Sequence, residues 1–377
     1  MENMEVMPVI KNYLLTPGPV EVPEKALEAG TTPMINHRCA RFSSLFEGIE
    51  EKLGTLLSSR CPVVILPSSG TGALECAAVN FLREGDTFIS LSCGVFGRRF
   101  REIAQRTGAK GVFVDAPEGS APTPRDAAEA VAAHPEARAL LITHNETSTG
   151  VTVPIKNIIA ALPQEKRPLV LVDGVSAVGA IECLPEEWGI DVLCTASQKG
   201  LLTPPGLGFV WLSERARAAL DDRECRSYYF DLKLQYKYMK PEGFENPYTP
   251  PVSLYYTLNT SLDLILEHGA QAWFAERKKY ATDFASALEC MGYELFVSDP
   301  KLRSPGLTAF SAPNGASNAV RAYLSSHGVE TAGGQASMKG KLIRAAHYGR
   351  RPAQETEDIL TAFANALREV QKQADGR

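Results

Sequence analysis

The chain has no apolar run near the roughly 18 residues that a helix needs to span a bilayer. It also has no block of Lys and Arg, and its net charge at pH 7 is a mild −5. Neither nucleic acid nor a membrane surface is therefore an expected partner. Residues 1–5 lack the basic start and apolar core of a signal peptide, so we expect a cytoplasmic protein.

Cysteine is present but unpatterned. The eight cysteines are scattered, with no CxxC pair and no spacing typical of metal ligands. Several of them lie inside apolar segments, where a free thiol behaves as a small hydrophobic group. We expect reduced thiols and no metal site.

Alternating strands and helices indicate the fold class. A chain of 377 residues is too long for one compact core and suggests about two domains. From about residue 45 to 215, short apolar runs alternate with helical stretches, which is typical of an α/β fold with a mainly parallel sheet covered on both faces. Residues 223–252 break this rhythm with tyrosines and prolines, and we interpret them as a surface or interface segment.

The second half predicts a smaller α+β unit. A long helix is expected from residue 254 to about 288, leading into a second domain. Its predicted strands are residues 293–297, 308–310 and 341–344. Its predicted helices are residues 319–327 and 356–372.

Two strand-like segments carry the strongest functional signal. One ends in Asp173, and the other, residues 190–196, is followed by Lys199. Ligands of open α/β sheets lie at the carboxyl ends of the strands. A lysine that forms a Schiff base and a carboxylate that keeps a pyridine nitrogen protonated are what pyridoxal phosphate requires. The alternative is two unrelated surface charges.

Three further strand ends carry chemistry of the same kind. Residues 68–72 form a strand-to-helix turn suited to phosphate, or else a plain turn with Thr71 capping the helix. Phe96, between two glycines, could stack on a pyridine ring or pack in the core. The polar loop 144–150 offers a hydroxyl for the cofactor's phenolic oxygen, or forms a self-satisfied turn. The convergence of five such ends favours the cofactor.

Several of these segments resemble a known family. The motifs are Thr-Pro-Gly-Pro at 16–19, Ser-Gly-Thr-Gly-Ala-Leu-Glu at 69–75, the 144–150 loop, Val-Asp-Gly-Val-Ser at 172–176, Ser-Gln-Lys-Gly at 197–200 and Pro-Pro-Gly at 204–206. They resemble class V aminotransferases, and more narrowly the alanine–glyoxylate and serine–pyruvate group, from about residue 14 to 350. The resemblance implies the fold type I of pyridoxal-phosphate enzymes, with a seven-stranded sheet. It divides the chain into an N-terminal arm (1–20), a large cofactor-binding domain (21–265) and a small domain (266–377).

The resemblance also implies roles for individual residues. Lys199 is the Schiff-base lysine and Asp173 the partner of the pyridine nitrogen. Arg344 binds the substrate α-carboxylate, and Gly18 lies beside the substrate. Cofactor-binding roles fall on Ser69, Gly70, Thr71, Phe96, Thr147, Asp173, Val175, Gln198, Lys199 and Thr249.

Three positions depart from the family pattern, and a fourth, which matches it, implies a second subunit. Phe96 stands where Trp or Tyr is commoner, Thr147 where Ser is usual, and Asn145 replaces a glycine. The last change bears on the substrate pocket. Thr249 corresponds to a threonine that reaches the phosphate of a neighbouring subunit, so a homodimer with shared active sites is expected.

The predicted activity is transfer of an amino group from a small amino acid, alanine or serine, to a small 2-oxo acid, glyoxylate or pyruvate. A 2-aminoethylphosphonate–pyruvate transaminase is an alternative, although that group typically has Gly-Ser-Arg-Asp where this chain has Ile-Asn-His-Arg at 35–38. Arg38 and Arg41 are candidate anion ligands near the substrate; the alternative is that both are solvated surface arginines. Ureidoglycine–glyoxylate transamination is a further option.

Two other hypotheses have less support in the sequence. A cysteine desulfurase needs a nucleophilic Cys on a loop of the second domain, and residues 328–341 contain none. A non-catalytic relative is favoured only by loss of the lysine or the aspartate, and both Lys199 and Asp173 are present.

Overall fold

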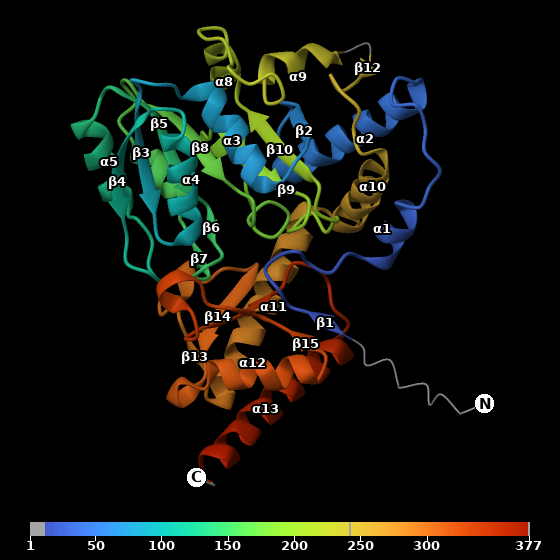
Figure 1. The fold of residues 1–377 in the computed structure, drawn as a ribbon, viewed down its shortest axis with the longest axis vertical. Coiled ribbons are helices and arrows are strands. Elements are labelled where there is room, and N and C mark those ends of the chain that lie inside the picture. The colour runs from blue at the N-terminus through green and yellow to red at the C-terminus, as the bar shows by residue number, and fades with distance from the viewer. Residues whose placement is uncertain (1–11, 241–242, 376–377) are drawn as a thin grey trace.

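The chain forms two regions, each built on its own sheet (Figure 1). The computed structural model describes residues 12–240 and 243–375. We call the part around the seven-stranded sheet the large-sheet region and the part around the four-stranded sheet the small-sheet region. Residues 1–11 of the predicted N-terminal arm lie outside the described residues.

The large sheet confirms the predicted seven strands. Strand β10 is antiparallel to both of its neighbours, and the other neighbouring pairs are parallel, so the sheet is mainly parallel. The strand order is β2 (Val63–Pro67), β10 (Leu207–Leu212), β9 (Val192–Ala196), β8 (Leu169–Asp173), β5 (Ala137–Thr143), β3 (Thr87–Ser92) and β4 (Lys110–Asp115).

Helices cover both faces of this sheet, which is why its central strands are almost continuously apolar. Side chains alternate between two cores: Ile65 faces the core that includes α2 and α10, and Val64 faces the core that includes α3 and α4. The helices up to residue 266 are α1 (Glu24–Ala29), α2 (Ala40–Leu57), α3 (Gly70–Phe81), α4 (Val95–Gln105), α5 (Pro124–Ala133), α6 (Ile155–Ala160), α7 (Pro185–Trp188), α8 (Glu214–Ala219), α9 (Leu232–Tyr238) and α10 (Val252–Leu266).

The small-sheet region is antiparallel throughout and has a core of its own. Phe363 packs edge-on against Phe284 and Phe310, with ring centroids 5.9 and 5.7 Å away. Its strands run in the order β13 (Glu294–Leu295), β14 (Leu307–Ser311), β17 (Ile343–Ala346) and β16 (Ala332–Gly333), and its helices are α11 (Ala270–Met291), α12 (Ser317–Ser326) and α13 (Ala353–Asp375).

The single long helix predicted from residue 254 to 288 is wrong, because the chain breaks between α10 and α11. Gly269 has a φ of +84°, in the left-handed region that side chains disfavour. Its N–H bonds the Leu266 carbonyl at 2.8 Å, which closes α10 before α11 begins. The glycine lets the chain turn from the large-sheet region into the small-sheet region.

Short strand pairs and 3₁₀ turns complete the chain. The pair β1–β15 is parallel and ties the N-terminal segment to the small-sheet region, while the other two pairs are antiparallel. The pairs are β1 (Tyr13–Leu14) with β15 (Val329–Glu330), β6 (Asn145–Glu146) with β7 (Val151–Thr152), and β11 (Met239–Lys240) with β12 (Gly243–Phe244); the 3₁₀ turns are Pro300–Leu302, Pro313–Gly315 and Ala336–Met338.

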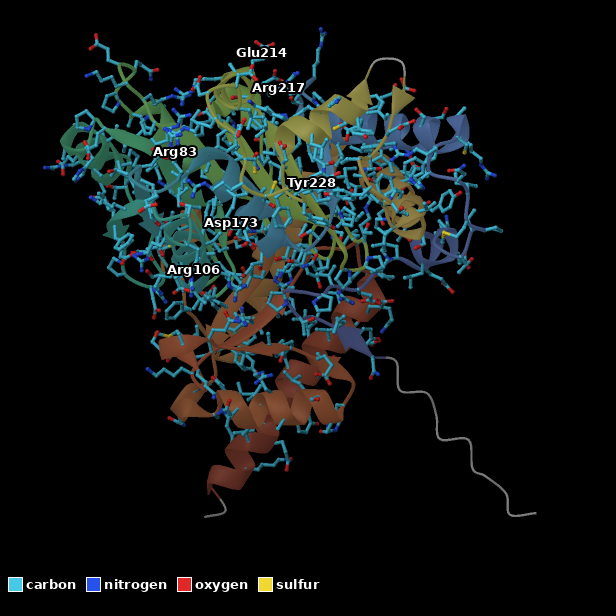
Figure 2. All side chains as sticks on the ribbon, turned by 45° about the horizontal axis from the view of Figure 1, so that its top comes forward. Arg83, Arg106, Asp173, Glu214, Arg217 and Tyr228 are labelled. Carbon is cyan, nitrogen blue, oxygen red and sulfur yellow. The ribbon has the colours of Figure 1, made fainter. Side chains whose placement is uncertain are left out.

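The segment 223–252 is more structured than predicted, since it contains α9 and the β11–β12 pair. Its aromatic character is still visible at the surface. The Tyr229 and Tyr248 rings stack with centroids 4.6 Å apart, and Tyr228 is largely exposed (Figure 2). Among the described residues, no helix has the length and apolarity to cross a membrane.

Candidate active site

Residues from five strand ends of the large sheet meet in one small pocket of about 130 Å³. All nine of the predicted cofactor residues other than Thr249 line it. In Figure 2, Asp173 lies on the side of the large-sheet region toward the small-sheet region, away from Glu214 and Arg217. The lining is Ser69, Gly70, Thr71, Leu74, Phe96, Arg99, Asn145, Thr147, Asp173, Val175, Ser176, Gln198 and Lys199.

Asp173 ends β8 as a buried carboxylate with only neutral donors from the protein. Its Oδ1 accepts from the Val175 N–H at 3.0 Å, and its Oδ2 accepts a long bond from the Thr143 hydroxyl at 3.4 Å. Burial raises the pKa of Asp173 from 3.8 to about 7, against the lowering effect of the Val175 bond. A cationic partner in the pocket would favour the ionised form, as a protonated pyridine nitrogen does.

Lys199 is a buried amine held under the N-terminal segment. Its Nζ donates to the Pro17 carbonyl, and a Cβ added to Gly18 would collide with the Lys199 side chain. Burial, and then the charge of Arg344, lower the pKa of Lys199 from 10.5 to about 8, while Asp173 opposes the shift. A larger share of the amine is therefore neutral near pH 8 than in an exposed lysine, and only the neutral amine is a nucleophile.

The turn before α3 presents backbone N–H groups to the pocket. Ser69 caps the helix, since its hydroxyl accepts from the Gly72 N–H at 3.2 Å, so the alternative of Thr71 as the cap is wrong. A Cβ on Gly70 would lie 2.8 Å from the Val175 side chain. Gly70 thus brings this helix N-terminus, a natural anion site, against the end of β8.

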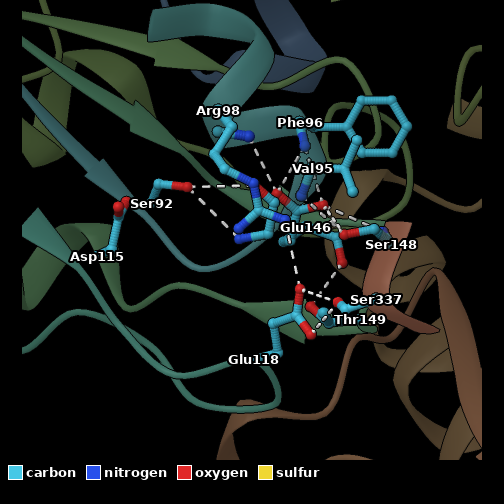
Figure 3. A network of polar contacts seen from close by, with 12 residues as sticks. Ser92, Val95, Phe96, Arg98, Asp115, Glu118, Glu146, Ser148, Thr149 and Ser337 are labelled. Carbon is cyan, nitrogen blue, oxygen red and sulfur yellow. Dashed lines mark hydrogen bonds and ion pairs between the residues drawn. The ribbon is translucent and has the colours of Figure 1, made fainter. Parts of the chain in front are cut away.

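Glu146 fixes the backbone that carries Phe96. Its fully buried carboxylate accepts from the N–H groups of Phe96 and Gly97, each at 3.0 Å to Oε2, and Oε1 accepts from the Ser148 hydroxyl at 2.5 Å (Figure 3). A carboxylate at the start of α4 also suits the helix dipole. In the same view, Glu118 bonds both Arg98 and Ser337, joining the two regions.

The polar loop 144–150 is packed inside the protein. All seven residues are buried, and two of them form β6. The Asn145 amide donates to the Ser176 hydroxyl and carbonyl, both at 3.1 Å. The side chains of Asn145, Glu146 and Ser148 are thus bonded inside the protein, which lets much of so polar a segment be buried.

Arg344 reaches the site from β17 of the small-sheet region. Its Nε donates to the Gly333 carbonyl at 2.8 Å, and its Nη1 donates to the Thr147 carbonyl at 2.9 Å. Two bonds leave part of the fork of five N–H donors without a protein partner in the described chain. The residue does not line the pocket itself, but its charge acts on Lys199.

The structure does not bring three other candidate residues into this pocket. Thr249 is exposed before α10. Arg38 binds Glu245 at 2.6 Å and lies over the Tyr238 ring, and Arg41 is exposed. A role for Thr249 thus depends on a second subunit.

The sequence analysis assigned no role to Thr143, Asn145, Glu146, Ser176 or Arg99, apart from linking the replacement of a family glycine by Asn145 to the substrate pocket. The first four act by bonding other site residues, and a sequence does not show such pairing. Arg99 had a signal that we overlooked: it follows Phe96 by three residues in a helix, so both side chains lie on one face. Its guanidinium lies 4.9 Å from the Phe96 ring centroid.

Comparison with known proteins shows which family the chain belongs to. A sequence model of the family Aminotransferase class-V matches residues 24–351. The chain belongs to the class-V aminotransferases.

Two relatives and one solved structure are similar over nearly the whole chain. The L-aspartate–glyoxylate aminotransferase of Paracoccus denitrificans is 34% identical over 349 residues, covering 90% of this chain and 87% of the relative. The serine–glyoxylate aminotransferase of Methylorubrum extorquens is 31% identical, with 90% and 87% covered. The alanine–glyoxylate aminotransferase of Nostoc sp. superposes with a TM-score of 0.89 at 28% identity, covering 97% of both chains.

This class-V aminotransferase has the fold type I of pyridoxal-phosphate enzymes and uses that cofactor. The pocket fits the group. Gln198 Oε1 is buried and has no partner among the described residues, and an amide can be turned to present its N–H₂ to a phosphate beside the α3 N-terminus. The Thr147 hydroxyl also has no protein partner in the described chain and lines the pocket.

Proposed function

We propose that this enzyme moves the amino group of alanine or serine to glyoxylate or pyruvate, with pyridoxal phosphate attached to Lys199. The observation that supports it most is the joint placement of Lys199 and Asp173 at one sheet edge, with Arg344 acting on Lys199 from the other region. Two of the proteins quoted above are named as a serine–glyoxylate and an alanine–glyoxylate aminotransferase.

Each residue would have a distinct task. Asp173 would keep the pyridine nitrogen protonated, and the bound cofactor supplies the electron sink that stabilises negative charge at the substrate Cα. Lys199 would move the proton between Cα and the cofactor's C4′. Phe96 and Val175 would enclose the ring from its two faces, and Thr147 would bond O3′.

The phosphate would be held by Ser69, Gly70, Thr71 and Gln198, and Gly18 would border the substrate. Arg344 would bind the α-carboxylate as a planar fork, because a bidentate pair fixes position and plane together. Its two bonds to backbone carbonyls hold that plane before substrate arrives. The fixed plane would orient the Cα–H bond toward Lys199.

Assembly and location are part of the proposal. Thr249 would contact the phosphate of a neighbouring subunit, which makes the enzyme a homodimer. The exposed aromatic segment around Tyr228 would lie in that interface, since two-fold interfaces bury the same patch on each partner. We also propose a cytoplasmic location and the domain division at 20/21 and 265/266.

Aspartate is a second candidate donor, favoured by Arg99. This arginine is exposed, lines the pocket and has no ion pair among the described residues, so it could receive a second carboxylate. A relative named for aspartate and glyoxylate is among the proteins quoted above. Arg38 and Arg41, which the aminoethylphosphonate alternative needs, do not line this chain's pocket. No residue that lines the pocket specifically favours ureidoglycine–glyoxylate transamination either.

A single screen tests the proposal: alanine, serine and aspartate as donors against glyoxylate, pyruvate and 2-oxoglutarate. Glyoxylate or pyruvate should exceed 2-oxoglutarate in kcat/KM by at least about tenfold, or about 1.4 kcal/mol. If aspartate is the donor, Arg99→Ala should lower kcat/KM for aspartate and leave kcat/KM for alanine and serine unchanged. Arg106→Ala is the control and should change none of them. Preference for 2-oxoglutarate, or phosphonoacetaldehyde formed from 2-aminoethylphosphonate, would reject the proposal.

A further inference from the structure

A second and much larger cavity, of about 730 Å³, lies between the large-sheet and small-sheet regions. Its volume is within the range of small-molecule sites. The large-sheet side of its wall comes from residues 144–157 and α7, and the small-sheet side from α11, β13 and β14. None of the residues that line the cofactor pocket lines this cavity.

The inner wall combines apolar side chains with polar atoms that have no partner. Val153, Ile155 and Phe274 are part of the apolar lining. His144 is 3% exposed and forms no side-chain hydrogen bond in the described chain, and its Nδ1 is buried and unpartnered. The Trp188 Nε1 is likewise unpartnered, and its ring meets that of His144 edge-on at 5.7 Å.

Unpartnered buried polar groups are uncommon in folded proteins and call for an explanation. Burial lowers the pKa of His144 to about 4, so its imidazole is neutral and offers one donor and one acceptor. A ligand with both a flat apolar body and a polar group would suit this wall.

The cavity lining has more basic than acidic side chains. Lys278 and Lys301 line it without an ion pair among the described residues, whereas Lys156 binds Glu187 at 2.7 Å. The acid in the lining, Glu182, already accepts from the Gln271 amide at 2.6 Å. Two unpaired lysines are complementary to an anionic ligand.

We propose that this cavity binds a small organic anion, a carboxylate carried on a flat aromatic body, at a site separate from the cofactor pocket. The apolar body lies among Phe274, Ile155 and Trp188, with His144 and the Trp188 N–H as polar partners. The carboxylate faces Lys278 and Lys301. The site does not depend on the substrate assignment above.

An occupant of this cavity would act on the active site through the wall between them. The backbone N–H of His144 donates to the backbone carbonyl of Asp173 at 2.9 Å, and the next residue, Asn145, lines the cofactor pocket. On the other side, the Ser304 N–H bonds the Gly150 carbonyl at 3.0 Å, tying the same loop to the small-sheet region that carries Arg344. Occupancy would therefore fix the position of Arg344, and with the carboxylate-binding role proposed above for this residue it would change the KM of the amino donor.

Isothermal titration of the holoenzyme with indole-3-acetate tests the site, since this probe has an aromatic body and a carboxylate but no amino or oxo group to transaminate. We expect a Kd of about 0.1 mM. The visible cofactor band should not shift. Ala275→Trp, at an exposed lining position of α11, should weaken binding at least about tenfold by filling the cavity, and Lys278→Ala about fivefold.

Matched variants locate the effect. Ala132→Trp on α5 and Lys110→Ala on β4 change the same residue types away from the cavity and should bind like wild type. Lys199→Ala, which removes activity, should also bind like wild type, so failure of the aminotransferase proposal and failure of this one are distinguishable. No binding at millimolar probe would overturn the inference. Binding that shifts the cofactor band and survives Ala275→Trp would also overturn it.

Discussion

The carboxyl edge of the seven-stranded sheet and the small-sheet region contribute to the active site in different ways. The sheet edge supplies side chains from five strand ends to the cofactor pocket. The small-sheet region contributes one arginine from the middle of an antiparallel strand, held by carbonyls from both regions. On the proposed roles, cofactor binding is a property of one sheet, whereas substrate binding depends on how two regions meet.

The largest expected effect is at the sheet edge. Asp173→Asn should fold but lose about a thousandfold in kcat, about 4 kcal/mol, because the amide cannot keep the pyridine nitrogen protonated. Steady-state kinetics and circular dichroism measure activity and folding together.

The control is Asp115→Asn, which also ends a parallel strand of this sheet but is exposed on the edge strand β4. It should keep wild-type turnover. Near-normal turnover in Asp173→Asn would remove the proposed role of that carboxylate.

Changing the arginine of the small-sheet region tests the other half of the comparison. Arg344→Lys keeps the charge but loses the planar fork, so KM should rise about 10- to 100-fold for both donor and acceptor. The absorption band of the bound cofactor should change little. Arg321→Lys, a neighbouring arginine whose Nη2 bonds the Thr331 carbonyl, is the control. If Arg344→Lys loses the cofactor and leaves KM unchanged, the division between the two regions is wrong.

A smaller effect is expected from a residue that acts only through another. Glu146→Gln keeps the shape but weakens the bonds to Phe96 and Gly97, so cofactor affinity should fall about tenfold. Visible circular dichroism of the bound cofactor should also change, because the Phe96 ring is less firmly placed. Glu118→Gln, in the same network but without a bond to Phe96, should keep both properties. Equal losses in the two variants would indicate a general effect on stability.

Local pattern was enough to predict the large sheet and the placement of Asp173 and Lys199 at strand ends, whereas most other site residues came from the family resemblance. Apolar runs indicate buried strands; Asp173 ends one such run, and Lys199 lies three residues beyond the end of another. The break at Gly269 was missed because the apolar spacing continues across it. The burial of the loop 144–150 was missed because its partners, such as Ser176, are distant in sequence. The cavity between the regions was missed for the same reason: its walls meet only in the folded chain.

The central claim is that the cofactor is attached to Lys199 beside Asp173. Borohydride reduction of the holoenzyme followed by peptide mapping tests it most directly. We predict a single phosphopyridoxyl label on Lys199, and neither label nor visible band in Lys199→Ala. A label on any other lysine of the wild-type enzyme would contradict the account.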